Sequence, residues 1–293
     1  MITAMKPGQQ NSFTDDAALV AASLAECTSW LPVRNAESNK ASNGRVLITG
    51  GEQSMAGAVS LAGWSACIAG AGLVRIATIP DNVASITCVR PELLVNPINN
   101  VAQLRELITG SDCHAIGPGL GQTDWSRDMF EFSLEHGRPS VIDADGLNLL
   151  AQAPEKRADW VLTPHPGEAA RLLKCKARDI QQDRLSAARE IVDHYGGVCI
   201  LKGKDSLVVS HTGPAVVCRY GNEALAVAGT GDVLTGLLAG LLAQGMDQRK
   251  AAITAVVLHA SAADRHAEMH GVIGMLASDL FLPLRQLRNS AMV

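Results

Sequence analysis

The sequence predicts an α/β fold with a mainly parallel, doubly wound sheet flanked by helices on both faces. Short apolar runs alternate with amphipathic or Ala-rich segments from Arg45 to Leu242, the pattern of repeated βαβ units. Hydrophobic residues make up 47% of the chain but aromatic residues only 3%, so the core must consist of Ala, Val, Leu and Ile. With 27 Gly, this composition suits close helix–sheet packing and tight strand-to-helix turns.

Six buried strands are expected between Arg45 and Lys202, each an apolar run closely followed by Gly, Asp, Pro or Lys. They span residues 46–49, Leu73–Thr78, 115–116, Ser140–Ile142, Trp160–Leu162 and Val198–Leu201. The segments between them have helical patterns and include Ala56–Ala69, 125–136 and 185–195.

The pattern changes after Lys202. Two apolar runs, Ser206–Ser210 and 215–218, are separated by a short turn and predict a hairpin. A helix with leucines at i, i+3 and i+4 positions is then expected over residues 234–242. Gly236 and Gly240 lie on another face of this helix, where we expect a second backbone to approach closely.

Two parts of the chain differ in character. Residues 1–44 are expected to form an N-terminal helix, over residues 15–30, and a polar linker over residues 35–44. Residues 45–293 contain the strand–helix alternation and the helices after it, and are expected to form the catalytic domain.

The charge and the cysteines exclude several classes of protein. A net charge of -4 with scattered Lys and Arg offers no surface for nucleic acid. The seven cysteines lie in apolar runs without a Cys-x-x-Cys pair, which is typical of reduced core residues. We find neither the apolar run of a signal peptide nor a stretch that spans a bilayer. We therefore expect a cytoplasmic protein that binds small molecules, not nucleic acids or membranes.

A turn near residue 230 carries the most information about function. Ligands of doubly wound sheets bind beyond the carboxyl ends of the strands. The segment Gly229-Thr230-Gly231-Asp232 precedes an apolar helix. Its glycines permit a turn whose amides point inward, and with the positive helix end they would form an anion hole for a phosphoryl group in transfer. Asp232 would either accept a proton from an attacking hydroxyl or simply cap the helix.

Two further Gly-rich stretches follow strands and open helices. Residues 50–58 lack the Lys-Ser/Thr ending of a P-loop and the spacing of a dinucleotide fingerprint, but small residues such as Ala58 leave room for a ligand. Residues 117–121 include Gly119 and Gly121, whose free amides a ring or phosphate can approach. Either stretch is also explained as a rigid strand-to-helix turn.

Charged residues close the later strands. Asp143 and Asp145 can hold magnesium through water or hydrogen-bond a sugar, and one of them can equally be a helix cap. His165, between two prolines, would be held at the pocket edge or have a structural role. Glu168, in a first helical turn, is explained by the helix dipole. Lys202 ends the strand before the hairpin, where nucleotide phosphates would meet it.

Eight motifs occur along the chain in an order that resembles the ADP/ATP-dependent NAD(P)H-hydrate dehydratases, and the similarity covers residues 31–280. They are Gly50-Gly with Met55-Ala-Gly-Ala58, Ala69-Gly-Ala-Gly-Leu-Val74, Gly117-Pro-Gly-Leu-Gly121, Asp143-Ala-Asp-Gly-Leu-Asn148, Thr163-Pro-His-Pro-Gly-Glu168, Gly231-Asp-Val-Leu-Thr-Gly236, Leu258-His-Ala-Ser-Ala-Ala-Asp264 and Leu276-Ala-Ser-Asp279.

The resemblance implies a ribokinase-like catalytic domain over residues 45–293 and a repair reaction. Hydrated NADH or NADPH would be phosphorylated on its ring hydroxyl by ADP or ATP with Mg²⁺, and loss of phosphate would restore NAD(P)H. By motif, the residues that contact the hydrate would be Ala58, Gly119, Gly121, His165 and Asp232. Those that hold the nucleotide would be Lys202, Gly203, Lys204, Asp205, Ser206 and Gly231. Catalysis would depend on Asp232, Gly229 and Gly231.

The chain departs from the family pattern at two places. Ala228-Gly-Thr230 replaces the usual Gly-Gly-Met, and Glu223-Ala224 replaces Pro-Gly. Thr230 brings the anion hole closer to that of ordinary ribokinase-like kinases. Two other functions therefore stay open: an ATP-dependent kinase of a small alcohol or sugar, and a non-catalytic nucleotide sensor, against which Asp232 argues. We also expect a homo-oligomer, since the Gly/Ala-rich helices offer surfaces for subunit contact.

Overall fold

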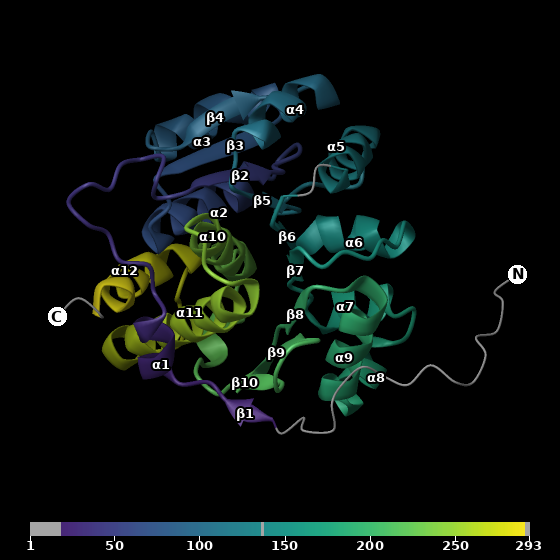
Figure 1. The fold of residues 1–293 in the computed structure, drawn as a ribbon, viewed down its shortest axis with the longest axis vertical. Coiled ribbons are helices and arrows are strands. Elements are labelled where there is room, and N and C mark those ends of the chain that lie inside the picture. The colour runs from purple at the N-terminus through teal and green to yellow at the C-terminus, as the bar shows by residue number, and fades with distance from the viewer. Residues whose placement is uncertain (1–18, 136–137, 291–293) are drawn as a thin grey trace, which may run out of the picture.

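A ten-stranded sheet crosses the computed structural model, which describes residues 19–135 and 138–290 (Figure 1). The strands are β1 (Val20–Ala21), β2 (Arg45–Thr49), β3 (Leu73–Thr78), β4 (Leu94–Pro97), β5 (Cys113–Ile116), β6 (Ser140–Ile142), β7 (Trp160–Leu162), β8 (Val198–Leu201), β9 (Ser206–Ser210) and β10 (Val216–Cys218). Their order in the sheet is β1-β10-β9-β8-β7-β6-β5-β2-β3-β4.

The direction of the strands makes the sheet mainly parallel. Strand β9 runs antiparallel to β8 and β10, while the other pairings are parallel. The chain places β3 and β4 on one side of β2, and then places β5 on the other side. Such a switch in strand order opens a crevice at the carboxyl ends of the two central strands. The predicted fold class and hairpin are thus confirmed.

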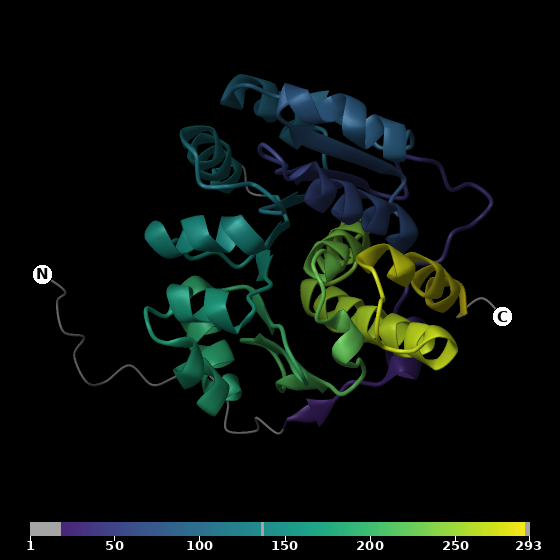
Figure 2. The same ribbon diagram turned by 180° about the vertical axis from the view of Figure 1, so that it is seen from behind.

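Helices cover both faces of the sheet (Figures 1 and 2). The α-helices are α1 (Leu24–Ser29), α2 (Ala56–Ala69), α3 (Val83–Val89), α4 (Val101–Thr109), α5 (Asp124–Leu134), α6 (Ala144–Gln152), α7 (Pro166–Leu172), α8 (Ala177–Gln182), α9 (Arg184–Tyr195), α10 (Thr230–Ala243), α11 (Gln248–His270) and α12 (Phe281–Asn289). Short 3₁₀ turns are η1 (Pro80–Asn82), η2 (Glu223–Leu225) and η3 (Ala277–Leu280). Helices α2, α10, α11 and α12 pack on one face, and α5, α6, α7 and α9 on the other.

Helix α10 packs directly on α2. A Cβ atom at Gly236 would overlap the carbonyl oxygen of Ala62, and one at Gly240 would lie 2.6 Å from the Cβ of Ala69. The predicted close approach of a second backbone is therefore confirmed. This packing fixes the start of α2, which carries Ala58, relative to the start of α10.

The N-terminal region differs from the expected helix over residues 15–30. Strand β1 adds to the sheet beside β10, and α1 begins only at Leu24, where the Ser23 hydroxyl accepts a hydrogen bond from the Glu26 amide at 3.5 Å. Residues 15–18 lie outside the described residues. Cys27 and Leu31 are buried in the same core as α11. The division of the chain at residue 44 stays a prediction.

Other differences concern short elements. Strand β4 was not expected; its residues are half-buried or exposed, and so it has no continuous apolar run. The helix predicted over residues 125–136 begins one residue earlier, at Asp124, because the Thr123 hydroxyl caps it. Within residues 19–135 and 138–290, we find no helix with the length and apolar character to cross a membrane.

Candidate active site

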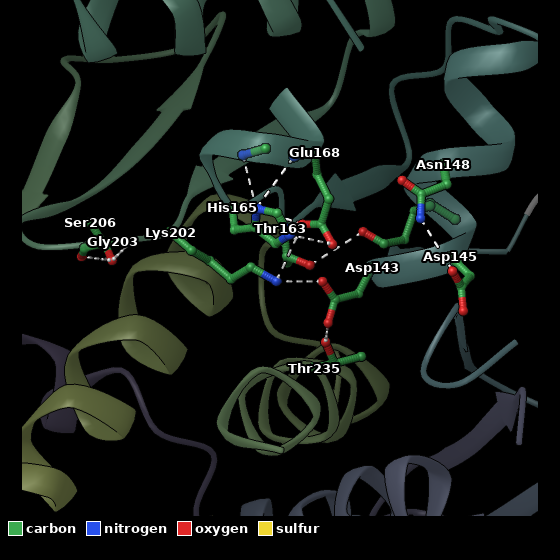
Figure 3. A network of polar contacts seen from close by, with 12 residues as sticks. Asp143, Asp145, Asn148, Thr163, His165, Glu168, Lys202, Gly203, Ser206 and Thr235 are labelled. Carbon is green, nitrogen blue, oxygen red and sulfur yellow. Dashed lines mark hydrogen bonds and ion pairs between the residues drawn. The ribbon is translucent and has the colours of Figure 1, made fainter. Parts of the chain in front are cut away.

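Residues from the ends of three neighbouring strands meet above the start of α10 (Figure 3). Lys202 follows β8 and Asp143 follows β6, while Glu168 lies in α7, which follows β7. The Nζ atom of Lys202 donates to Oδ1 of Asp143 at 2.6 Å and lies 3.7 Å from Oε2 of Glu168. Thr235, on α10, donates its hydroxyl to Oδ2 of Asp143 at 2.6 Å. The sheet and α10 are thus joined by one polar network.

The ionisation of this network follows from its burial and its charges. Burial alone would raise the pKa of Asp143, but the Lys202 ammonium and the hydrogen bonds from Lys202 and Thr235 hold it below its ordinary value. Burial likewise opposes the charge of Lys202, yet Asp143 and Glu168 raise its pKa. Burial, together with the Asp143 charge, raises the pKa of Glu168 to about 7 although Lys202 opposes this. Asp143 and Lys202 therefore form an ion pair, while Glu168 exchanges a proton near neutral pH.

Asp232 lies in the first turn of α10, beside this network. Burial raises its pKa to about 7, with a further contribution from the Asp143 charge, while Lys202 opposes the rise. The N-cap residue of α10 is Gly229, and no side chain makes the capping hydrogen bond at this described helix end. A carboxylate with a pKa near the working pH is suited to take a proton from a hydroxyl. The geometry therefore favours the base over the helix cap.

The turn before Asp232 is held rigidly. Gly229 has a φ of 90°, a conformation that favours glycine, and a Cβ there would lie 2.6 Å from Cδ1 of Leu61. The Thr230 hydroxyl donates to the carbonyls of Leu225 and Val227 at 3.0 and 3.1 Å. Nε2 of the buried His259 lies 2.9 Å from the Thr230 carbonyl. Because burial lowers the pKa of His259 to about 4, its neutral ring donates this hydrogen bond.

The helix end next to this turn is open to an anion. The first amides of a helix have no partner within it, and the helix dipole adds positive charge there. A Cβ on Gly231 would lie 3.6 Å from Nζ of Lys202 and 3.9 Å from Oδ2 of Asp143. The turn and the ion pair therefore face one another, as a phosphoryl-transfer site requires.

The two Gly-rich loops at the switch in strand order lie against each other. The amides of Gly51 and Glu52 donate to the carbonyls of Pro118 and Gly119 at 3.1 and 2.7 Å. A Cβ at Gly119 would lie 3.2 Å from the Cβ of Ala58. Ala58 and Gly119, two of the predicted substrate contacts, are therefore neighbours in a wall of small residues.

The prediction that the Gly121 amide is free, in contrast, is wrong. The amide donates to Oδ2 of Asp145 at 2.9 Å, while Oδ1 of Asp145 accepts from the Asn148 side chain at 3.2 Å. Asp145 thus acts locally, by holding the loop after β5 against the start of α6.

His165 caps α7. Its Nδ1 accepts hydrogen bonds from the amides of Gly167 and Glu168 at 2.9 and 3.4 Å, and its own amide donates to Oε2 of Glu168 at 2.7 Å. Burial and the nearby Lys202 charge lower the pKa of His165. His165 therefore has the predicted structural role, and its backbone amide positions Glu168. Half of the His165 side chain stays exposed, which leaves it accessible to a ligand.

A comparison with known protein families decides between the ribokinase-like families. The sequence profile described as NAD(P)H-hydrate dehydratase matches residues 46–285. The chain belongs to this family. The resemblance seen in the eight motifs is thereby confirmed.

Relatives of this chain are found among bifunctional enzymes. The bifunctional NAD(P)H-hydrate repair enzyme Nnr of Coxiella burnetii is 44% identical over 259 residues, which cover 88% of this chain and 53% of the relative. The Nnr enzyme of Escherichia coli is 42% identical, with 91% and 52% covered. The chain therefore spans about half the length of the curated relatives it matches.

A solved structure has the same fold. The ADP/ATP-dependent NAD(P)H-hydrate dehydratase from Bacillus subtilis, co-crystallised with ATP/Mg²⁺, superposes with a TM-score of 0.83 at 29% identity and covers 93% of this chain and 99% of that one. The ribokinase-like fold of this chain is thereby confirmed.

The predicted nucleotide-binding residues after Lys202 form a separate, mostly exposed turn. The Ser206 hydroxyl accepts from the Gly203 amide at 3.2 Å and donates to the Gly203 carbonyl at 2.9 Å. Lys204 and Asp205 are exposed. The Arg184 guanidinium donates to the Leu201 carbonyl at 3.1 Å and lies close to Gly203. That this turn binds nucleotide stays a prediction. Lys202 does not belong to the exposed turn, because its side chain points to Asp143.

Three members of the network, Asp143, Glu168 and Thr235, are not among the predicted site residues. The sequence offers Asp143 as a magnesium ligand, a sugar ligand or a cap, and Glu168 as a residue near a helix dipole, while Thr235 stands in the Gly231–Gly236 motif without a role of its own. The available signal is position, since Asp143 directly follows β6 and Glu168 lies in the first turn of the helix after the adjacent strand β7. Thr235 carries no local signal because its contact depends on how α10 crosses the sheet.

Proposed function

We propose that this chain dehydrates hydrated NADH or NADPH to NAD(P)H by phosphorylating the hydrate with ADP or ATP. The observation that carries the proposal is the position of Asp232, a carboxylate with a raised pKa, in the turn that faces the Lys202–Asp143 pair. Family membership supports the substrate class.

In the first step, the ring hydroxyl of the hydrate attacks the terminal phosphorus of the nucleotide. Asp232 accepts the hydroxyl proton, a new P–O bond forms, and the P–O bond to the shortened nucleotide breaks. The amides of the turn from Gly229 to Gly231 and the positive end of α10 stabilise the charge on the transferred group. The ammonium of Lys202 adds positive charge on the opposite side.

In the second step, the phosphate leaves with the C–O bond electrons. The adjacent ring carbon passes a proton to water, and the electrons of its C–H bond restore the double bond of the reduced nicotinamide. The net change is loss of water from the hydrate together with hydrolysis of one phosphoanhydride. Phosphorylation converts a poor leaving group, hydroxide, into a good one, which explains why a kinase-like site serves a dehydration.

Magnesium is the metal that this chemistry implies, but the protein residues do not form a site for it by themselves. Within the described residues there is no group of three or more His, Cys, Asp or Glu side chains able to hold a metal. Both oxygens of Asp143 are engaged by Lys202 and Thr235. We therefore infer that Mg²⁺ arrives bound to nucleotide phosphates and water, as is usual for this ion. When bound, it would neutralise phosphate charge.

The test is an assay with purified chain, NADH hydrate or NADPH hydrate, and ADP or ATP. Restored absorbance of the reduced nicotinamide, with one phosphate released per turnover, is expected. A stable phosphorylated product without restored nicotinamide would instead indicate the kinase of a small alcohol or sugar. Nucleotide binding without any turnover would indicate the sensor. Running both hydrates and both nucleotides also decides the donor and the preferred substrate.

A further inference from the structure

An arginine-lined cavity of about 660 Å³ lies apart from the candidate active site, between the C-terminal half of α2, the segment after α3, and α12. Four arginines line it, namely Arg34, Arg90, Arg285 and Arg288. Glu92 is the acidic residue among the lining residues. A cavity with this excess of positive charge is complementary to an anion.

Part of the charge is explained by the end of α2. Arg34 donates to the Gly70 carbonyl at 2.8 Å, and Arg288 donates through Nε to the Ala69 carbonyl at 2.9 Å. Both bonds satisfy carbonyls in the last turn of the helix, where its dipole is negative. Arg288 also donates through Nη2 to the Pro32 carbonyl and to Oε1 of Gln244. A guanidinium has five N–H donors, so the Nη1 donors of Arg288 and most donors of Arg34 stay available.

Among the described residues, Arg90 and Arg285 make no hydrogen bond of this kind. Nε of Arg90 is buried without a hydrogen-bond partner in the described structure, although its guanidinium stacks 3.1 Å from the ring centroid of Trp64. Arg285 is exposed on α12, one turn before Arg288. Burial lowers the pKa of Arg288, and the like charge of Arg34 contributes. Positive charge therefore accumulates here without a matching set of carboxylates.

The other wall of the cavity is apolar. Trp64, Ile68 and Leu93 line it, and Trp64 packs on Phe281 of α12 with the ring centroids 3.8 Å apart. A bare anion would leave this wall unused, whereas a ligand with a flat apolar part would cover it. Arginine also suits phosphate in particular, since its planar fork can donate two parallel hydrogen bonds.

We propose that this cavity binds a small organic phosphate, with the phosphate among Arg34, Arg285 and Arg288 and the apolar part against Ile68 and Leu93. The site is separate from the proposed phosphoryl-transfer site. Ala58 lies at the N-terminal end of α2 and the cavity at its C-terminal end, and a helix of 14 residues is about 21 Å long.

The experiment is a calorimetric titration of the full chain with phenyl phosphate, which combines a phosphate with a flat apolar ring. Saturable binding is expected, and Arg285→Gln and Arg34→Gln should each raise Kd about tenfold, since each removes a charge-assisted hydrogen bond. Arg178→Gln, an equally exposed arginine on α8, is the matched control and should leave Kd unchanged. Thermal melting of each variant verifies that it is folded.

A second set of arms separates this site from the first. Lys202→Gln should leave phenyl phosphate binding in place, because Lys202 belongs to the other site. Inorganic phosphate should bind at least several-fold more weakly than phenyl phosphate, because it makes no contact with the apolar wall. The proposal is overturned if phenyl phosphate does not bind, if it binds equally to Arg285→Gln, or if Lys202→Gln abolishes binding. Equal affinity for inorganic phosphate would contradict the proposal that the ligand has an apolar organic part.

Discussion

The Nζ atom of Lys202 and the Oδ1 atom of Asp143 lie 2.6 Å apart, although the two residues end strands β8 and β6 and β7 lies between them. The pair spans the end of β7, next to Glu168. Removing either charge would leave its buried partner uncompensated. Lys202 thus has two tasks: it neutralises carboxylates, and it presents positive charge to the turn that carries Gly231.

Lys202→Met is expected to destabilise the fold by about 3 kcal/mol, because a buried carboxylate loses its partner. Chemical denaturation at pH 8, where Asp143 and Glu168 are ionised, measures the change. Lys204→Met, in the exposed turn two residues later, is the matched control and should change stability by less than about 0.5 kcal/mol. Adding Asp143→Asn to Lys202→Met should recover part of the loss. Equal stability of the Lys202 and Lys204 variants would contradict the ion pair.

Asp232→Asn is expected to remain folded and to bind nucleotide, since Asn has nearly the same shape and the amides of the turn are untouched. Turnover of the hydrate should fall about a hundred- to ten-thousand-fold, because the amide cannot accept the hydroxyl proton. Steady-state kinetics and a nucleotide titration on the same sample check both statements. A variant that keeps full turnover would return Asp232 to the role of a structural residue.

Gly236→Ala is expected to destabilise the chain by about 1–3 kcal/mol, because its methyl group would overlap the Ala62 carbonyl and force α10 away from α2. Gly57→Ala, on α2, is the control: a Cβ there has no neighbour within 4 Å. The control should be neutral or stabilising by up to about 1 kcal/mol. Thermal unfolding of the two variants compares them directly, and equal melting temperatures would refute the tight packing.

The central strands of this fold can be predicted from sequence because parallel strands are covered on both faces. Val198–Leu201 is therefore a continuous, fully buried apolar run. The edges lack this signal. Strand β4 includes Asn96 and Pro97, and β1 is only two residues long and exists because it pairs with β10. An edge strand is decided by its partner, which the local sequence does not contain.

The candidate site shows the same division. The turn before Asp232 can be predicted because glycines at the start of a helix are typical of an anion-binding site. The partner of Lys202 cannot, since it depends on which strands are neighbours, and residue 143 is 59 positions away along the chain. The amide of Gly121 was expected to be free, yet Asp145 accepts its hydrogen bond. Long-range pairings of this kind follow from the topology of the sheet.

The two acids with raised pKa values predict how the chain responds to pH. The pKa of Asp232 is about 7 in the folded protein against an ordinary 3.8. A raised carboxyl pKa means that the folded state holds the proton more tightly. The stability from this group is complete below about pH 4 and is lost as pH rises through 7. As pH rises from 4 to 8, the free energy of unfolding of the parent should therefore fall relative to that of Asp232→Asn. The difference should change by at most about 1.4 kcal/mol per pH unit.

Because His165 and His259 have lowered pKa values and act in the opposite direction, the difference between parent and variant is the quantity to measure. Activity should change with the opposite sign, since only ionised Asp232 accepts a proton. Thus kcat/KM of the parent should rise with pH and level off above about 7. Glu168 has a pKa of about 7 as well, so Glu168→Gln decides which acid is responsible. If Asp232 is the base, Glu168→Gln keeps the rising limb, shifted only modestly. Loss of that limb in Glu168→Gln would instead make Glu168 the base and overturn the mechanism proposed for Asp232.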